Sequence, residues 1–246
     1  MRTLKYVLLG IVLMLAIAIT GFLVWANNPL AALPEALKAQ QSNSQVQVTE
    51  EEGWIVFQPA GAQVDTGLIL YPGGRVDPRA YAPVARAISE QGYLVAIVPM
   101  PLNLAVFGSD CAQDVIAAYP QIQHWAVGGH SLGGAMAARF AYRHPDLIQG
   151  LALWAAYPAS GDDLSGQSLK VVSMIGSQDG LGTAKGVDAT QNLLPPDTRF
   201  VVIDGGNHAQ FGWYGDQPGD NPATISRTDQ QAQVVAATLE LLGRIK

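Results

Sequence analysis

The stretch AVGGHSLGGAM, residues 126–136, decides how the rest of this chain is interpreted. An apolar run precedes it and an alanine-rich run follows it, which predicts a tight turn between a strand and a helix. Inside it, residues 129–133 form the pattern G-x-S-x-G around Ser131. At such a turn the serine backbone is strained, and the glycines let strand and helix approach closely. The pattern alone is weak in a chain with 26 glycines, so the partners of Ser131 must come from elsewhere in the sequence.

Short apolar runs and helical stretches alternate on both sides of this turn. Two strands at the start, 45–48 and 54–57, read as an antiparallel hairpin. The remaining strands are predicted at 67–71, 93–98, 124–127, 148–155, 169–175 and 199–203, and the helices at 78–91, 109–119, 132–143, 183–194 and 228–245. This order predicts an α/β fold, a mostly parallel sheet with an antiparallel N-terminal hairpin and helices on both faces. The working loops of such a sheet follow the carboxyl ends of the strands.

A serine nucleophile needs a histidine base, and the chain has four histidines. His208 lies in DGGNH, residues 204–208, in a loop after a predicted strand. His130 lies inside the turn and is expected to point elsewhere, His124 opens its strand at the far end, and His144 ends a helix. Elimination therefore favours His208 as the base.

The imidazole in turn needs a carboxylate that fixes its tautomer. Asp179 lies in GSQDG, residues 176–180, after strand 169–175 and before His208 in the chain. Asp204 is the rival, but it is only four residues from His208 and is better suited to forming a turn with its own backbone. We therefore expect Asp179 to be the carboxylate partner of His208.

The loop after strand 67–71 is Pro72-Gly73-Gly74-Arg75, and its glycines let backbone N–H groups turn toward Ser131. With the Leu132 N–H at the helix start, Gly74 or Arg75 would complete an oxyanion hole. Arg75 is also a candidate to hold a substrate carboxylate, although a solvated side chain is the simpler expectation. A phosphate-binding role is disfavoured because no lysine-containing phosphate loop follows.

The N-terminus has a different composition from the rest. Residues 6–26 (YVLLGIVLMLAIAITGFLVWA) carry no charge, and Arg2 and Lys5 precede them. This predicts a transmembrane anchor over residues 1–26, with a cleaved signal peptide as the alternative. Either one places the domain outside the cytoplasm, because the positive charge lies before the segment. Residues 27–45 read as a linker with one short helix that holds the domain, residues 46–246, off the membrane.

Composition excludes several classes of protein. The net charge is −6 and no basic cluster occurs, which argues against nucleic-acid binding. The single cysteine, Cys111, rules out an internal disulfide and a multi-cysteine metal site. We predict no cofactor and no metal.

These residues together resemble the α/β-hydrolase superfamily, over nearly all of residues 46–246. The elbow GHSLGG, the loops GSQDG and GGNHAQFG and the oxyanion loop PGG match its pattern, in the chain order Ser131, Asp179, His208. The chain is most similar to the small bacterial hydrolases related to dienelactone hydrolase and to carboxylesterases. It departs from dienelactone hydrolases in having serine in place of the nucleophilic cysteine, so lactone specificity is not implied.

Only residues 157–167 separate the two strands between which many relatives insert a helical lid. An uncapped site on a tethered domain favours short-chain or protruding ester groups. The loop 209–225 carries Phe211 and Trp213, which are candidates to wall the substrate pocket, with Met100 on the opposite side. The alternative is a purely structural role, in which this surface loop folds on its own aromatic side chains.

The resulting prediction is a membrane-anchored, extracytoplasmic serine hydrolase of carboxylic esters or thioesters. Ser131 attacks the carbonyl, His208 moves the proton, and Asp179 orients His208. The alternatives are an acyltransferase with the same triad and a non-catalytic binding module of the same fold.

Overall fold

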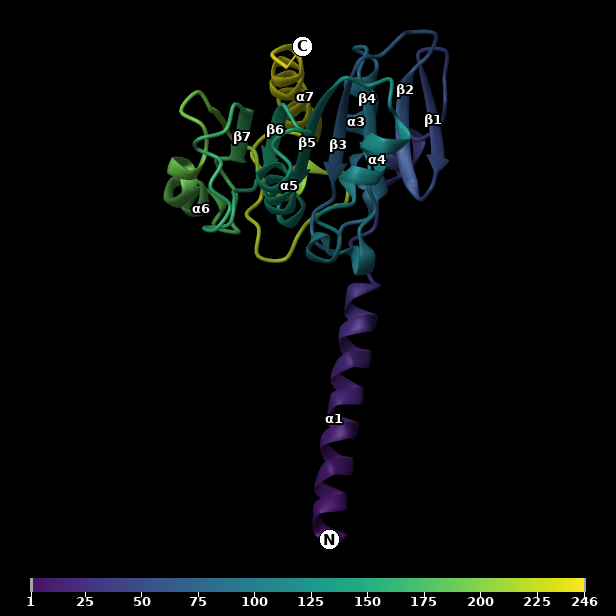
Figure 1. Cartoon of the computed structure of the whole chain (residues 1–246), viewed down its shortest axis with the longest axis vertical. Coiled ribbons are helices and arrows are strands. Elements are labelled where there is room, and N and C mark those ends of the chain that lie inside the picture. Colours follow the sequence, from purple (N-terminus) through teal and green to yellow (C-terminus); the bar gives the residue numbers. More distant parts are fainter. Residues whose placement is uncertain (1, 246) are drawn as a thin grey trace.

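The computed structural model describes residues 2–245, and a long first helix projects from its layered body (Figure 1). This helix, α1, spans Arg2–Ala26. Within the described residues, Lys5–Ala26 is the single segment long and apolar enough to cross a membrane, and none of its residues in the most apolar window is buried. The apolar helix predicted from the sequence is present, and a signal sequence would meet the same criterion of length and composition.

The strands of residues 2–245 form one sheet in the order β1-β2-β4-β3-β5-β6-β7-β8. They are β1 (Val46–Glu51), β2 (Trp54–Pro59), β3 (Thr66–Tyr71), β4 (Leu94–Ile97), β5 (His124–His130), β6 (Gly150–Trp154), β7 (Lys170–Gly176) and β8 (Arg199–Ile203). The pairs β1–β2 and β2–β4 are antiparallel, and every later pair is parallel. The predicted fold class is therefore confirmed, including its antiparallel N-terminal hairpin.

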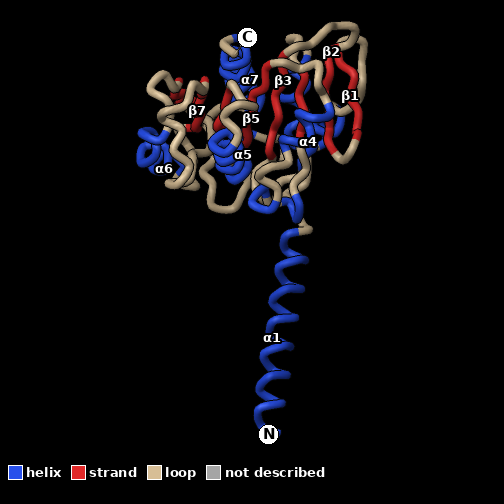
Figure 2. Tube along the Cα trace, viewed as in Figure 1, coloured by secondary structure: helices blue, strands red, loops and turns tan. Residues whose placement is uncertain are grey.

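Helices cover both faces of the sheet (Figure 2). On one face α3 (Ala82–Ser89) and α7 (Arg227–Gly243) bury apolar side chains against the strands. On the other face α4 (Ala112–Ala118) and α5 (Leu132–Arg143) do the same. Because both faces are covered, every residue of β3 and β6 is buried, which explains their continuous apolar sequences.

Short helical segments connect these elements. They are α2 (Pro34–Lys38), α6 (Thr183–Thr190) and the 3₁₀ turns η1 (Pro78–Tyr81), η2 (Pro101–Asn103), η3 (Ala105–Phe107), η4 (Gln191–Leu193) and η5 (Ala209–Phe211). Residues 155–169, between β6 and β7, contain turns and no helix, so no helical lid covers the sheet edge at this point, as expected.

Residues 27–45 lie against the domain. The Leu30 N–H donates to the Arg75 carbonyl over 2.7 Å, and the Leu33 N–H donates to the Trp213 carbonyl over 2.8 Å. Ala36, in α2, is fully buried. This differs from the expectation of a spacer that holds the domain away, because the backbone polar groups of this segment find their partners on the loops of the domain.

Candidate active site

Ser131 occupies a strained turn between β5 and α5. Its φ of 54° and ψ of −123° lie in a region that residues with a side chain rarely adopt. The turn is held by the Ser131 N–H, which donates to the Trp154 carbonyl of β6 over 2.9 Å. At Gly133 a Cβ would collide with the carbonyl oxygens of Tyr71 and Pro72, so only glycine lets α5 start this close to β3. The glycines therefore provide the close approach that the sequence predicted.

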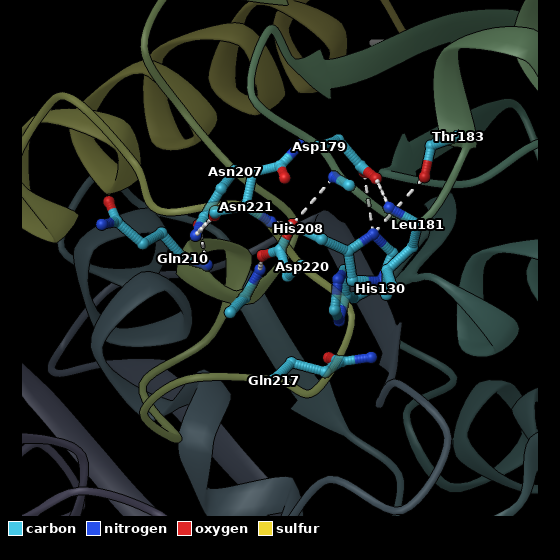
Figure 3. Close-up of polar contacts among 12 residues, drawn as sticks. His130, Asp179, Leu181, Thr183, Asn207, His208, Gln210, Gln217, Asp220 and Asn221 are labelled. Carbon is cyan, nitrogen blue, oxygen red and sulfur yellow. Dashed lines mark hydrogen bonds and ion pairs between the residues drawn. The ribbon is translucent and has the colours of Figure 1, made fainter.

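Asp179 and His208 form a buried pair, although 29 positions separate them in the chain (Figure 3). His208 Nδ1 lies 2.8 Å from Asp179 Oδ2, and the two side chains are only 3% and 1% exposed. The other carboxylate oxygen of Asp179 accepts the Leu181 N–H over 2.9 Å. Burial alone would raise the pKa of Asp179, but the hydrogen bonds from His208, Thr183 and Leu181 outweigh it and lower this pKa below its ordinary value.

This pairing fixes the state of the imidazole. An ionised carboxylate only accepts hydrogen bonds, so the proton of neutral His208 belongs on Nδ1 and Nε2 is left as the basic nitrogen. Nε2 is buried and has no hydrogen-bond partner among the described residues. His208 and Ser131 line the same cavity. The nitrogen without a partner therefore belongs to a residue that lines the same cavity as the strained Ser131.

The alternative carboxylate and two of the alternative histidines lie away from the Asp179–His208 pair. Asp204 is exposed, and its carboxylate accepts a hydrogen bond from the Ser177 hydroxyl over 3.2 Å. His144 pairs with Asp110 at 3.3 Å. His124, the first residue of β5, lies at the opposite end of this strand from Ser131.

A residue that the sequence did not single out, Asp220, ties the loops of Asp179 and His208 together. One of its oxygens accepts the Gly180 N–H over 3.0 Å and the other accepts the Ala209 N–H over 2.8 Å. Each donor directly follows a member of the pair, so the Asp220 carboxylate sets the spacing of the two loops. No local signal in the sequence marks it, because a bridging carboxylate in a long loop looks like any surface aspartate.

His130 packs beside His208 and contacts Tyr81. It is 1% exposed, and its Nδ1 lies 2.8 Å from the Tyr81 hydroxyl, which also accepts the Gly73 N–H over 2.9 Å. Its ring centre lies 4.5 Å from that of His208 and it stacks on Phe211. Burial, and after it the neighbouring His208, lowers the pKa of His130 well below its ordinary value. His130 is therefore a neutral packing group that connects the turn of Ser131 to the loop after β3.

The loop after β3 offers one free backbone donor next to Leu132. The Arg75 N–H is already bonded to the Asn103 carbonyl, over 2.7 Å. For the Gly74 N–H, the described residues provide no acceptor. A Cβ at Gly74 would lie 3.2 Å from Leu132 Cδ2, so the two residues are neighbours. Of the two donors expected in this loop, Gly74 is the one whose N–H remains available beside the start of α5.

The side chain of Arg75 has a different task from those expected. Its Nε donates to the Trp25 carbonyl over 2.7 Å and its guanidinium also donates to the Asn28 carbonyl over 2.6 Å. The guanidinium carbon lies 4.4 Å from the centre of the Trp25 ring. Arg75 therefore binds the C-terminal end of α1, a contact that the sequence did not indicate.

The cavity at Ser131 has a volume of about 300 Å³ and is mostly apolar. Its lining consists of Ser131, Leu132, Ala135, Ala155, Ala156, Tyr157, Leu181, Thr183 and His208. This places the pocket between α5, the loop after β6 and the start of α6. No sequence pattern indicated that Tyr157, Leu181 and Thr183 line this cavity, since their approach to Ser131 depends on the packing of α6.

The three residues expected to wall the pocket lie elsewhere. Phe211 is fully buried and stacks on His130. Trp213 has the Arg227 guanidinium over its ring, at 5.8 Å, and its backbone bonds to Ala80 and Leu33. Met100 is buried beside Gly108. These side chains stabilise the loops around the site. They differ from the prediction because apolar side chains in such loops are buried against the protein instead of lining the cavity.

The sequence profile described as Alpha/beta hydrolase family matches residues 67–232. No curated protein matches the chain in sequence.

Three solved structures share the fold. The esterase domain of a Rhodothermus marinus protein has a TM-score of 0.62 at 14% identity, and covers 81% of this chain and 99% of its own. Dienelactone hydrolase from Anabaena variabilis has a TM-score of 0.59 at 18% identity, with coverage of 80% and 99%. A predicted CIB-like hydrolase from Thermoplasma acidophilum has a TM-score of 0.58 at 16% identity, with coverage of 80% and 98%. At these identities the similarity concerns the fold.

Proposed function

Because the chain belongs to the alpha/beta hydrolase family, we propose that it hydrolyses carboxylic esters or thioesters through an acyl-enzyme on Ser131. The observation that carries the proposal is the His208–Asp179 contact of 2.8 Å. It leaves Nε2 of His208 without a partner, and His208 lines the same cavity as Ser131. A serine becomes nucleophilic when such a base takes its proton.

The reaction proceeds in two halves. Ser131 Oγ bonds to the substrate carbonyl carbon while its proton moves to His208 Nε2, and Asp179 stabilises the imidazolium. The negative charge on the former carbonyl oxygen meets the N–H groups of Leu132 and Gly74. The bond to the leaving alcohol or thiol breaks as His208 returns the proton to it. Water then attacks the acyl-enzyme in the same way, which releases the acid and restores Ser131.

The lining of the cavity supports an uncharged acyl group. Apart from His208 it contains no titratable side chain other than the Tyr157 phenol, and Leu132, Ala135, Ala155 and Ala156 supply methyl and methylene contacts. An ester whose acyl part is apolar gains from burial there, whereas a charged group would lose its hydration without a partner. The structural relatives include an esterase domain and a dienelactone hydrolase, which favours the same substrate class.

We further propose that α1 anchors the protein and that the catalytic domain lies outside the cytoplasm. Arg2 and Lys5 precede the apolar segment, and positive charge stays on the cytoplasmic side. Retention of α1 is favoured over cleavage because Ala26 is fully buried and Arg75 bonds to the Trp25 carbonyl. Cleavage at this point would remove partners of the folded domain.

The test is a kinetic comparison of the purified full-length chain in detergent with two serine variants. Ser131→Ala removes the proposed nucleophile, and Ser168→Ala removes an exposed serine in the loop between β6 and β7. On p-nitrophenyl esters from acetyl to palmitoyl we expect Ser168→Ala to match the parent protein and Ser131→Ala to lose activity by about 10⁴-fold or more. Equal activity of all three proteins would exclude Ser131 as nucleophile, and no turnover by any of them would favour a non-catalytic binding module. Product esters formed in the presence of added alcohol would indicate acyl transfer.

A further inference from the structure

The loops beside the candidate oxyanion hole hold the end of α1. Arg75 Nε donates to the Trp25 carbonyl over 2.7 Å, and Asn103 Nδ2 donates to the Ala26 carbonyl over 3.0 Å. Arg75 and Asn103 are themselves joined by the 2.7 Å backbone bond between the Arg75 N–H and the Asn103 carbonyl. The last carbonyl groups of a helix have no partner inside the helix and form its negative end, which a guanidinium satisfies well. α1 is thus docked on the catalytic edge of the domain.

The position of a bilayer along α1 follows from its length. Lys5–Ala26 comprises 22 residues. At 1.5 Å per residue this is about 33 Å, close to the ~30 Å of a bilayer core. The membrane surface on the side of the domain therefore lies at Trp25 and Ala26. Tryptophan and arginine are side chains expected at headgroup depth. Arg75, which lies over the Trp25 ring, shares this depth.

The oxyanion loop and the nucleophile are close behind this layer. Gly74 precedes Arg75 and packs against Leu132, the residue after Ser131. The carboxyl edge of the sheet consequently faces the bilayer, while the C-terminus lies at the opposite end of the domain (Figure 1).

An apolar projection lies next to α1 on the same edge. Val106 and Phe107, in η3, are 49% and 54% exposed. The ring of Phe107 lies 6.5 Å from that of Phe22, which is within the apolar span of α1, one turn before its end. Because Phe22 lies within the bilayer, the neighbouring Phe107 lies at the depth of the interface. Its apolar side chain is removed from water there.

The cavity at Ser131 has an apolar rim as well as an apolar lining. Tyr157 and Leu181, which line it, are each 40% exposed. Exposed apolar groups at the entrance to a site oppose entry of a strongly hydrated substrate and favour an acyl chain.

We infer that this enzyme takes its substrate from the membrane: an ester-linked amphiphile whose acyl chain rests in the leaflet on the side of the domain and whose carbonyl lies at headgroup depth. The inference rests on the proposed ester hydrolysis and adds to it the source and class of the substrate. α1 fixes the height of the catalytic edge, and Phe107 inserts beside it and brings the cavity to the interface.

The first test compares a membrane-resident ester with a soluble ester. The full-length chain is reconstituted in phosphatidylcholine vesicles that contain p-nitrophenyl palmitate, and p-nitrophenyl butyrate in solution is the reference substrate. Phe107→Ser should lower turnover of the palmitate ester about fivefold and leave the butyrate rate within about twofold. Phe200→Ser is the matched control, because Phe200 is 45% exposed on β8, outside the loops that hold α1, and it should change neither rate.

The outcomes separate the two proposals. Equal palmitate rates for Phe107→Ser and the parent protein, or hydrolysis of butyrate alone, would overturn the membrane-derived substrate and leave ester hydrolysis standing. Failure to hydrolyse either ester would overturn the proposed function itself.

A second test reads the position of Phe107 without activity. In a Cys111→Ser background, which removes the single cysteine, Phe107→Cys and Phe200→Cys each carry an environment-sensitive nitrobenzoxadiazole label. In vesicles the label at 107 should emit at shorter wavelength and be quenched by brominated lipids, while the label at 200 should do neither. Equal behaviour of both labels would overturn the inserted position of Phe107.

Discussion

At the scale of single residues, the Asp179–His208 contact is the main support for the proposed role of Ser131 as a nucleophile. Its geometry assigns the Nδ1 proton of His208 and leaves Nε2 as base, with two buried side chains that keep this arrangement. Asp179→Asn replaces an acceptor by a group that can donate, which stabilises the wrong tautomer. We predict a loss of kcat of about 10³- to 10⁴-fold with little change in KM on p-nitrophenyl butyrate.

Asp204→Asn is the matched control for this substitution, because Asp204 is exposed and bonds to Ser177. It should keep the kcat of the parent protein within about twofold. A large loss of kcat in Asp204→Asn with none in Asp179→Asn would mean that Asp204, and not Asp179, is the carboxylate partner of His208.

His130 predicts a pH dependence of stability. Its pKa in the folded protein lies well below 6.5, chiefly because of burial, whereas in the unfolded chain the imidazole is free to take a proton. As pH falls below 6.5 only the unfolded state gains this proton, so folding loses up to about 1.4 kcal/mol per pH unit from this residue. Above 6.5 neither state is protonated and the effect vanishes.

The measurement is urea unfolding of the full-length chain in detergent between pH 7.5 and 5.5. His130→Asn should show a flatter fall of the unfolding free energy over this range than the parent protein. Parallel curves for the two proteins would mean that His130 titrates normally in the folded state.

Residue positions were predictable where a residue follows a strand. Ser131, Asp179 and His208 each follow a strand, and this position together with their chain order led to the roles proposed for them. Asp220 and Tyr81 escaped prediction because they act through partners distant in sequence, on loops whose mutual approach no local pattern encodes. The contact of Arg75 with α1 escaped prediction for a similar reason, since its partner Trp25 lies 50 positions earlier.

At the scale of elements, the contact of α5 with β3 determines whether the turn of Ser131 can form. Gly133→Ala would drive a methyl group into the carbonyl oxygens of Tyr71 and Pro72, and backbone cannot yield as a flexible side chain does. We predict a loss of about 2–4 kcal/mol in the free energy of unfolding, measured by urea denaturation. Gly166→Ala, where a Cβ meets no atom within 4 Å, is the control and should stay within about 0.5 kcal/mol of the parent protein.

The strands and long helices were predictable because their burial is written in their sequences. The run of β6 is apolar throughout and that of β3 is apolar after Thr66, which is the pattern of strands covered on both faces. Residues 27–45 were predicted as a free linker because they carry no such pattern. They hold to the domain through apolar contacts such as that of buried Ala36 and through backbone hydrogen bonds, which any sequence can make and which therefore leave no trace in composition.

At the scale of the whole molecule, α1 and the catalytic edge form one unit. Trp25, Ala26 and Asn28 supply carbonyl groups to side chains of the domain, and Leu30 pairs with the backbone beside Val76. Under the proposed anchoring by α1, these contacts limit the tilt of the domain and keep the candidate site at a constant distance from the bilayer.

This arrangement predicts that α1 is retained. After expression with a C-terminal tag and fractionation, the intact chain should stay with the membranes through an alkaline carbonate wash, and its mass should include residues 1–26. A shortened chain in the soluble fraction would instead identify the N-terminal segment as a cleaved signal.

The central claim, that Ser131 is the nucleophile activated by His208 and Asp179, is tested most directly by locating a covalent adduct. The full-length chain is treated with a fluorophosphonate, digested with trypsin and mapped by mass spectrometry, with Asp179→Asn and Ser131→Ala in parallel. We predict one adduct, on Ser131, formed more slowly in Asp179→Asn and absent in Ser131→Ala. An adduct on another residue, or none in the parent protein, would contradict the claim.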